Sequence, residues 1–191
     1  IFGYVLLNDW SARDIQAWEA QPLGPFQGKA FGTSISPWVV TRTALDPFRV
    51  PGPSPEKPLL PYLREPRALK YDIDLTVAIR PSGASAPSVV TRSNARNLYY
   101  SSAQMVAHHA SGGCRMDIGD LLGSGTISGE DRSSWASLLE LTWGGRNAIQ
   151  LDGVERRFLE DGDSVILSGR ASRDGVRIDF GTCEGTILSA F

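Results

Sequence analysis

The alternation of apolar and polar positions is clearest between residues 71 and 80. A period of two is typical of a half-buried β-strand. The turn at residues 81–83 (PSG) leads to a second apolar run at residues 88–91, so the two runs are predicted to form a hairpin. The apolar face of the first strand consists of Tyr71, Ile73, Leu75, Val77 and Ile79.

Shorter runs rich in Val, Ile, Leu and aromatic residues predict further strands. The chain opens with one at residues 1–7, and a second occupies residues 35–42. Glycine pairs and Asp-Gly turns separate the later runs. These later predicted strands lie at residues 121–124, 138–143, 148–151, 164–168 and 176–180.

Two segments have the pattern of helices. Ser11 can cap a helix that has Asp14 at its third position and ends near Trp18. A second helix is expected from about Asn94 until the glycines at 112 and 113 stop it. The spacing of its apolar residues predicts one buried face. That face consists of Leu98, Tyr99, Met105, Val106 and His109.

Seven of the 12 prolines lie between residues 47 and 66. Proline interrupts helices and central strands, so this segment is expected to be a long surface excursion. No internal repeat or second domain boundary is visible. The patterns therefore predict one domain, residues 1–191, of the mainly β (α+β) class with two main helices.

Composition excludes several classes of function. A chain of 191 residues with 41% apolar and 21% charged residues can bury one sizeable core. The net charge of −2 gives no basic surface for nucleic acid. Cys114 and Cys183 are too few for a disulfide scaffold or a cysteine-rich zinc site. No apolar run approaches the roughly 20 residues of a membrane span, so we expect a cytoplasmic protein.

The most polar cluster, residues 8–16 (NDWSARDIQ), lies where the first strand meets the first helix. Asp9 at a strand end is a suitable ligand for a hard cation such as Mg²⁺ or Ca²⁺. Arg13 and Gln16 are three residues apart, so they share a helix face and can direct donors at one substrate oxygen. Helix capping by Asp9 or Ser11, with Arg13 at the surface, is the structural alternative.

Two glycine-containing segments also carry candidate chemistry. Glycines near Lys29, in residues 26–34 (FQGKAFGTS), let the backbone approach a ligand, and Lys29 can then stabilise an oxyanion. A solvated lysine is the alternative. Residues 119–129 (GDLLGSGTISG) can present amides and hydroxyls to an anion, although they lack the spacing of a phosphate-binding loop.

Three further side chains, Glu140, His108 and His109, are of types that can take part in catalysis. Glu140 lies among leucines in a predicted strand, so a buried carboxylate there needs a partner. His108 and His109 are adjacent on a helix and point about 100° apart, so they cannot both bind one metal ion. A core role is expected for His109. No serine lies in a G-x-S-x-G elbow, which disfavours a serine hydrolase.

Taken together, residues 8–16, 28–33 and 119–129 resemble signatures of the fumarylacetoacetate hydrolase family in order and spacing. Other stretches are closer to the branch that acts on fumarylacetoacetate than to acylpyruvate hydrolases, decarboxylases or isomerases. These stretches are residues 22–26, 35–40 and 139–141.

The resemblance implies a mixed β-roll, a homodimer, and one Mg²⁺ or Ca²⁺ ion that chelates a diketo acid substrate. The implied reaction is hydrolysis of a carbon-carbon bond of fumarylacetoacetate to fumarate and acetoacetate, a step of tyrosine and phenylalanine catabolism. Arg13, Gln16 and Lys29 would stabilise the alkoxide, and Glu140 would orient a histidine base. The implied metal positions are Asp9, Lys29 and Thr33, and the implied substrate positions are Gln16 and Thr126.

Two departures from the family pattern limit these expectations. The family's histidine base and three further metal carboxylates precede the equivalent of Ile1, so the chain is expected to be a fragment that binds metal weakly and is inactive alone. Ala20 occupies a position where a tyrosine that contacts substrate is expected. An acylpyruvate-type hydrolase and a non-catalytic dimerisation module therefore remain alternatives.

Overall fold

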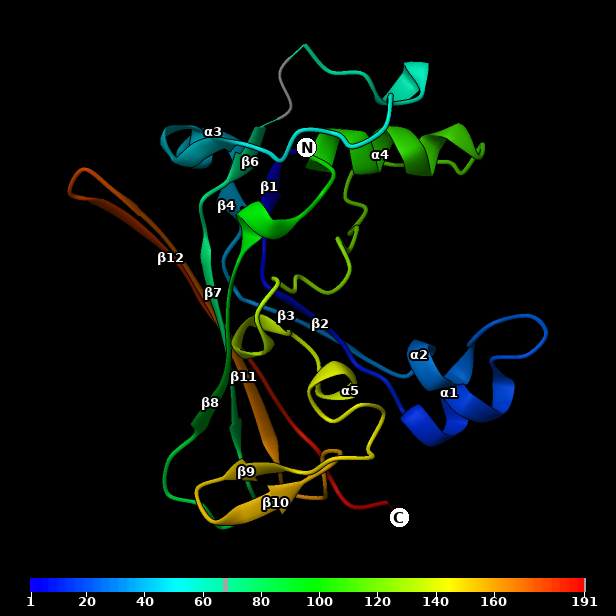
Figure 1. Ribbon diagram of the computed structural model, residues 1–191, viewed down its shortest axis with the longest axis vertical. Coiled ribbons are helices and arrows are strands. Elements are labelled where there is room, and N and C mark those ends of the chain that lie inside the picture. The colour runs from blue at the N-terminus through cyan, green and yellow to red at the C-terminus, as the bar shows by residue number, and fades with distance from the viewer. Residues whose placement is uncertain (67–68, 191) are drawn as a thin grey trace.

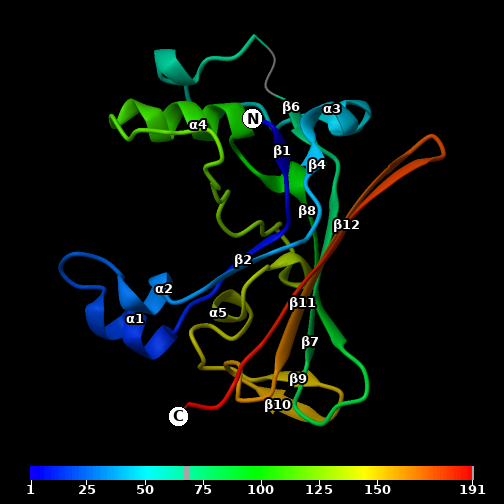
Figure 2. The ribbon, with the colours of Figure 1, turned by 180° about the vertical axis from the view of Figure 1, so that it is seen from behind.

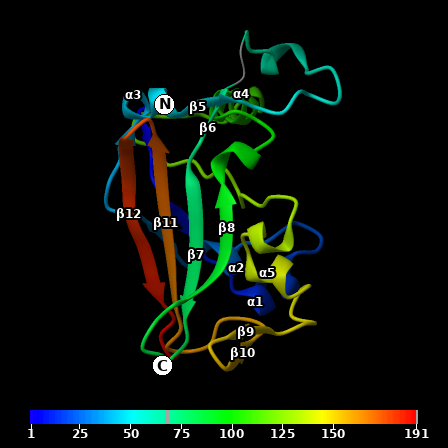
Figure 3. The same ribbon diagram turned by 60° about the vertical axis from the view of Figure 1, so that its left-hand side comes forward.

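A four-stranded antiparallel sheet dominates the computed structural model, which describes residues 1–66 and 69–190 (Figure 1). Its strand order is β12–β11–β7–β8, and Figure 3 shows the four strands side by side. The predicted hairpin and the last two predicted strands are confirmed. The first strand of the hairpin begins at Asp74, because Tyr71 belongs to a separate short strand, and the other three strands are longer than expected. The strands are β7 (Asp74–Arg80), β8 (Ser88–Asn94), β11 (Ser164–Arg173) and β12 (Val176–Thr186).

Four two-stranded antiparallel pairs surround this sheet. They are β1 (Gly3–Tyr4) with β4 (Val40–Thr41), β2 (Leu7–Asp9) with β3 (Thr33–Ile35), β5 (Arg49–Pro51) with β6 (Leu69–Tyr71), and β9 (Ile149–Leu151) with β10 (Val154–Arg156). The fold is mainly β, as predicted.

Two predicted strands of the N-terminal region are interrupted. The run at residues 1–7 is divided between β1 and β2, and the run at residues 35–42 is divided between β3 and β4. The second break includes Pro37, which has no N–H to donate to a ladder. Ser36 is buried there and its Oγ accepts the N–H of Leu6 at 2.9 Å.

The two longest helices are those that the sequence predicted, but their starts differ. Ala12, and not Ser11, is the N-cap of α1. The other long helix begins after Ser101, which forms a capping box with Gln104, whereas Asn94 caps only a short 3₁₀ turn. The helices are α1 (Arg13–Glu19), α2 (Gln27–Ala30), α3 (Arg42–Leu45), α4 (Ser102–Ser111) and α5 (Leu138–Leu141), with 3₁₀ turns η1 (Asp46–Phe48), η2 (Pro61–Leu63), η3 (Ala95–Asn97) and η4 (Arg132–Ser134).

Three sequence predictions in the second half of the chain are wrong. Residues 138–143 form helix α5 and a turn, because Ser137 caps the helix through the N–H of Glu140. Residues 121–124 form no strand. His109 is exposed on α4 and is not a core residue.

The proline-rich segment follows the surface, as predicted, and most of its residues are exposed. Phe48 and Leu63 are its buried anchors. Gln104 of α4 donates its Nε2–H to the carbonyl oxygen of Leu63 at 2.8 Å, which holds η2 against α4. Among the described residues, no helix has the length and apolar character that a membrane span requires.

Two hydrophobic clusters hold the sheet to the smaller elements. One contains Phe180 of β12 together with Leu45 and Phe48. The second contains Ile79 and Val165 of the sheet, Leu141 of α5, and both ends of β9. Trp10, directly after β2, packs against this second cluster. Helices α1, α2 and α5 lie on the same side of the sheet (Figures 1 and 2).

Candidate active site

Residues 7–35, which we call the β2–β3 unit, bring most of the predicted site residues together. Strands β2 and β3 pair so that Asp9 lies opposite Thr33. Helices α1 and α2 form the connection between the two strands and pack against each other (Figure 1). Segments at both ends of this 29-residue stretch of sequence are therefore adjacent, as the candidate site requires.

Lys29 is the centre of this unit. Its Nζ lies 2.7 Å from Asp9 Oδ2, 3.0 Å from the Asp9 carbonyl oxygen and 2.8 Å from Ser11 Oγ. The Lys29 side chain is 27% exposed and that of Asp9 is 55% exposed. An ion pair this exposed contributes little to stability, so folding alone gives no strong reason for it. Ser11 was predicted to cap α1 but instead binds Lys29.

Arg13 and Gln16 share a face of α1, as their spacing predicted. Arg13 Nη1 donates to Gln16 Oε1 at 2.7 Å. Partial burial lowers the pKa of Arg13, and the nearby Asp9 carboxylate opposes this shift. A guanidinium remains charged at neutral pH in either case. The Gln16 amide group and the remaining N–H groups of Arg13 can therefore both act as donors.

Glu19 connects α1 to α2 and was not identified from the sequence. Its Oε1 accepts the backbone N–H groups of Phe26 at 2.7 Å and Gly28 at 2.6 Å, and its Oε2 accepts that of Gln27 at 3.0 Å. Burial raises the pKa of Glu19, but the three amide hydrogen bonds outweigh it and the pKa lies below its ordinary value. The carboxylate is therefore charged at neutral pH.

Glu140 has the partner that its half-buried position requires. Ser128 Oγ lies 2.8 and 3.0 Å from its two carboxylate oxygens, and Ser137 Oγ lies 3.0 Å from Oε2. Neither serine was singled out from the sequence. The spacing of Ser137 before Glu140 matches a helix cap, whereas nothing local identifies Ser128.

Thr126 lies in the irregular segment that precedes Ser128, and its side chain is exposed. Among the described residues, no hydrogen bond joins Thr126 to Asp9 or Lys29. Helix α5 and the β2–β3 unit are nevertheless anchored to one hydrophobic cluster, through Leu141 and Trp10. The predicted site residues thus form two groups on the same side of the sheet.

Comparison with known families now adds to this geometry. The model of the fumarylacetoacetate (FAA) hydrolase C-terminal domain matches residues 1–188. The chain belongs to this family. Both groups of predicted site residues lie within the matched region, which covers almost the whole chain.

The chain is similar throughout to curated fumarylacetoacetases. It is 58% identical over 192 residues to that of Emericella nidulans, which covers 98% of this chain and 44% of the relative. It is 54% identical over 188 residues to the fumarylacetoacetase of Arabidopsis thaliana, which covers 98% of this chain and 45% of the relative. The identity to the fumarylacetoacetase of Mus musculus is 51% over 191 residues, which covers 100% of this chain and 46% of the relative. The chain therefore spans less than half the length of these relatives.

The chain has ligands of the type that a hard cation binds, but it has too few of them to form a complete site. Asp9 supplies a carboxylate and Thr33, its cross-strand neighbour, supplies a hydroxyl. Oxygen ligands of this type are those that Mg²⁺ and Ca²⁺ prefer. Within residues 1–66 and 69–190, no group of three His, Cys, Asp or Glu side chains could hold a metal ion. The chain can contribute to such a site and would need further ligands.

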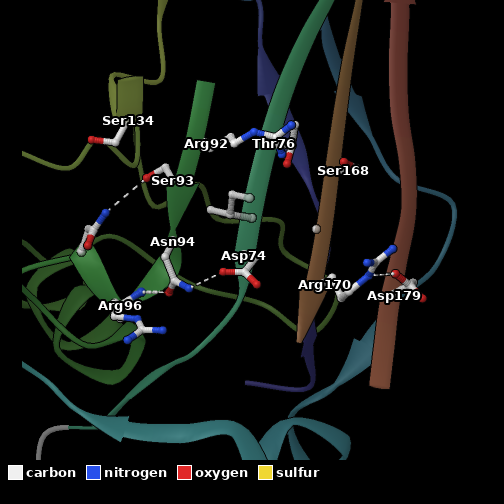
Figure 4. A pocket seen from close by; sticks show the side chains of 13 residues that line it. Asp74, Thr76, Arg92, Ser93, Asn94, Arg96, Ser134, Ser168, Arg170 and Asp179 are labelled. Atoms are coloured by element: carbon white, nitrogen blue, oxygen red, sulfur yellow. Dashed lines mark hydrogen bonds and ion pairs between the residues drawn. The ribbon is translucent and has the colours of Figure 1, made fainter. Parts of the chain in front are cut away.

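A hollow with a volume of about 750 Å³ lies elsewhere, over β7, β8 and β11. Figure 4 shows two pairs among its lining residues: Arg170 donates to Asp179 at 2.9 Å, and Asn94 donates to Asp74 at 3.0 Å. None of the predicted site residues lines this hollow. It is therefore separate from the candidate active site.

Proposed function

We propose that this chain forms part of the active site of a metal-dependent hydrolase that cleaves fumarylacetoacetate into fumarate and acetoacetate. The arrangement of Lys29 beside Asp9 and Ser11, next to the Arg13–Gln16 pair, is the observation that carries the proposal. The names of the fumarylacetoacetases to which the chain is similar support this choice of substrate.

The chain's residues would act on the charge that develops during the reaction. Water adds its oxygen to the carbonyl carbon next to the bond to be cleaved, and its proton passes to a base. The carbonyl oxygen becomes an alkoxide, which Lys29, Arg13 and Gln16 stabilise as donors. When the alkoxide collapses, the carbon-carbon bond breaks, and its electron pair leaves with the acetoacetate carbon, which then takes up a proton.

A divalent cation, Mg²⁺ or Ca²⁺, would polarise the two oxygens of the diketone and orient the substrate. Asp9 would hold it through its carboxylate, with Lys29 and Thr33 as immediate neighbours. We infer that Gln16 and Thr126 contact the substrate.

Glu140 would orient the base and stabilise the positive charge that the base acquires. Ser128 and Ser137 hold this carboxylate in place. We infer that the base is a histidine outside these 191 residues, because both histidines of the chain lie on α4, where His108 binds Tyr62 Oη at 3.1 Å and His109 is exposed. The proposal includes a homodimer, the remaining part of the protein as partner, and a cytoplasmic location.

Activity measurements on two proteins test this proposal. The purified 191-residue chain should bind Mn²⁺ weakly and hydrolyse no fumarylacetoacetate, whereas the complete gene product should hydrolyse it with added Mg²⁺ or Ca²⁺. In the complete protein, Lys29→Met should lower kcat about 100- to 1,000-fold, as the loss of one oxyanion donor does. Full turnover by the isolated chain, or by Lys29→Met, would contradict the assigned roles.

An acylpyruvate-type hydrolase is the second candidate function, and Ala20 is the observation that supports it. Ala20 is the C-cap of α1 and has only a methyl side chain where the family pattern has tyrosine. Assays of the complete gene product with fumarylacetoacetate and with an acylpyruvate would separate the two substrates. Inactivity toward both, together with stable dimers, would instead indicate a non-catalytic dimerisation module.

A further inference from the structure

Helix α2 is short and buries no large side chain. It is a single turn of four residues, and Gly28 is its only buried residue. An isolated turn of this length is unstable, and the N–H groups at its start have no partners within the helix. A contact from outside α2 must therefore hold it, and the carboxylate of Glu19 accepts three N–H groups at that point.

The packing of α2 against α1 is close and specific. A Cβ atom on Gly28 would lie 2.7 Å from the backbone nitrogen of Gln16 and 2.9 Å from Glu19 Oε1. The carbonyl oxygen of Gly28 also accepts the N–H of Ala12 at 2.9 Å. Any larger residue at this position would push α2 away from both Glu19 and Gln16.

Lys29 directly follows Gly28, so its backbone position depends on this contact. Its Nζ reaches across to Asp9 and Ser11, which lie before α1 in the sequence. Helix α2 is therefore fixed twice. Glu19 binds its first N–H groups, and the Lys29 ammonium group binds Asp9 and Ser11. Movement of α2 away from α1 would draw the ammonium group away from Asp9.

We propose that Glu19 is the positioning residue for Lys29, holding α2 against α1 so that the ammonium group is fixed beside Asp9 and Ser11. The catalytic consequence rests on the proposed function, whereas the positioning itself does not. Glu19 does not touch the groups that would react.

The test uses the complete gene product with Glu19→Ala, Glu19→Gln and a control, Glu56→Gln. Glu56 is an exposed glutamate of the proline-rich segment, so its replacement removes one charge far from α2. Glu19→Ala should remove hydrogen-exchange protection from the amides of Phe26, Gln27 and Gly28. It should also increase the acetylation of Lys29 by an amine reagent several-fold, as measured by peptide mass spectrometry.

Displacement of the Lys29 ammonium group should slow the reaction. Glu19→Ala should lower kcat about 100-fold with little change in KM. Glu19→Gln keeps an oxygen in place of Oε1, which carries two of the three hydrogen bonds, so it should rescue part of the loss. Partial rescue also guards against a trivial folding defect in the alanine variant.

A double-mutant cycle separates positioning from a general structural role. If Glu19 acts through Lys29, adding Glu19→Ala to Lys29→Met should lower kcat no further. Multiplicative losses, or unchanged Lys29 labelling and amide protection in Glu19→Ala, would overturn the proposal. If the unmodified protein hydrolyses no fumarylacetoacetate, the proposed function fails, and labelling and exchange still decide the positioning.

Discussion

The four-stranded sheet and the β2–β3 unit are stabilised in different ways. The sheet contributes Phe180, 2% exposed, and Ile79, 1% exposed, to two apolar clusters. Helix α1 of the β2–β3 unit has no buried residue, and Trp18 on it is 90% exposed. Trp10 and the β2–β3 ladder attach the unit to the rest of the fold, and polar contacts of Glu19 and Lys29 fix α1 and α2 within it.

This difference separates the residues that make the fold from those that make the site. Apolar burial stabilises the sheet without regard to exact side-chain orientation, whereas hydrogen bonds fix individual donors and acceptors in direction. Substitutions in the sheet should therefore affect the free energy of unfolding. Substitutions in the β2–β3 unit should affect the geometry of Lys29 more than the stability of the whole chain.

Replacing a core aromatic residue should have the largest effect on stability. Phe180→Ala should lower the free energy of unfolding by about 3–5 kcal/mol, because it removes a buried ring and leaves a cavity. Phe26→Ala in the β2–β3 unit is the matched control, since Phe26 is 55% exposed, and it should cost about 0.5 kcal/mol or less. Urea unfolding measures both, and equal losses would contradict the comparison.

The buried ion pair of Arg156 and Asp163 provides a pH-dependent test of the sheet region. Burial raises the pKa of Asp163, but the hydrogen bond from Arg156, the N–H groups of Glu160 and Ser82, and the charge of Arg156 together lower it. The contribution to stability is therefore complete above the ordinary aspartate pKa of about 4 and is lost as the pH falls through the lowered value.

Asp163→Asn should cost about 3 kcal/mol at pH 7, because it leaves the buried Arg156 with only the exposed Glu160, at 3.4 Å, as a charged partner. Unfolding measured from pH 6 to pH 2 should show a steeper acid loss in the unmodified chain than in the variant. Parallel curves would show that Asp163 contributes no pH-dependent stability.

Gly28→Ala tests the close packing of α1 and α2. The added methyl group should displace α2 at a cost of about 1–3 kcal/mol and increase the labelling of Lys29. Gly32→Ala is the matched control, because its Cβ would meet only Trp10, at 3.9 Å. Comparison of thermal unfolding and Lys29 acetylation checks this prediction, and identical labelling in the two variants would argue against it.

Ser128→Ala should have the smallest effect on stability. It removes one hydroxyl partner of Glu140 and should cost about 1 kcal/mol. Ser133→Ala, at an exposed position of η4, should change the free energy of unfolding by less. In the complete gene product, the loss in kcat from Ser128→Ala should exceed that from Ser133→Ala if Glu140 orients the base.

The strands of the sheet could be predicted because the alternation of apolar and polar residues is visible within each strand. The alternation at residues 71–80 and the turn that follows gave β7 and β8 directly. Residues 138–143 misled the prediction because a short apolar run fits a strand or a buried helix equally well. Only the Ser137 cap, with Glu140 three residues later, indicated the helix that forms.

The placement of some candidate residues was predictable from the sequence, but most of their contacts were not. The spacing of Arg13 and Gln16 placed both on one face of α1, and the structure bears this out. Glu19 and Ser128 have no local pattern, because their partners lie seven to twelve residues away in loops or other elements. Such contacts depend on how α2 and α5 are placed by the rest of the fold.

A crystal structure of the complete gene product with Mn²⁺ tests the central claim most directly. We expect one metal ion bound to Asp9 at roughly 2.2 Å, in a cavity that Lys29 and Thr126 also line. A metal ion bound elsewhere, or Asp9 and Thr126 on surfaces that share no cavity, would contradict it.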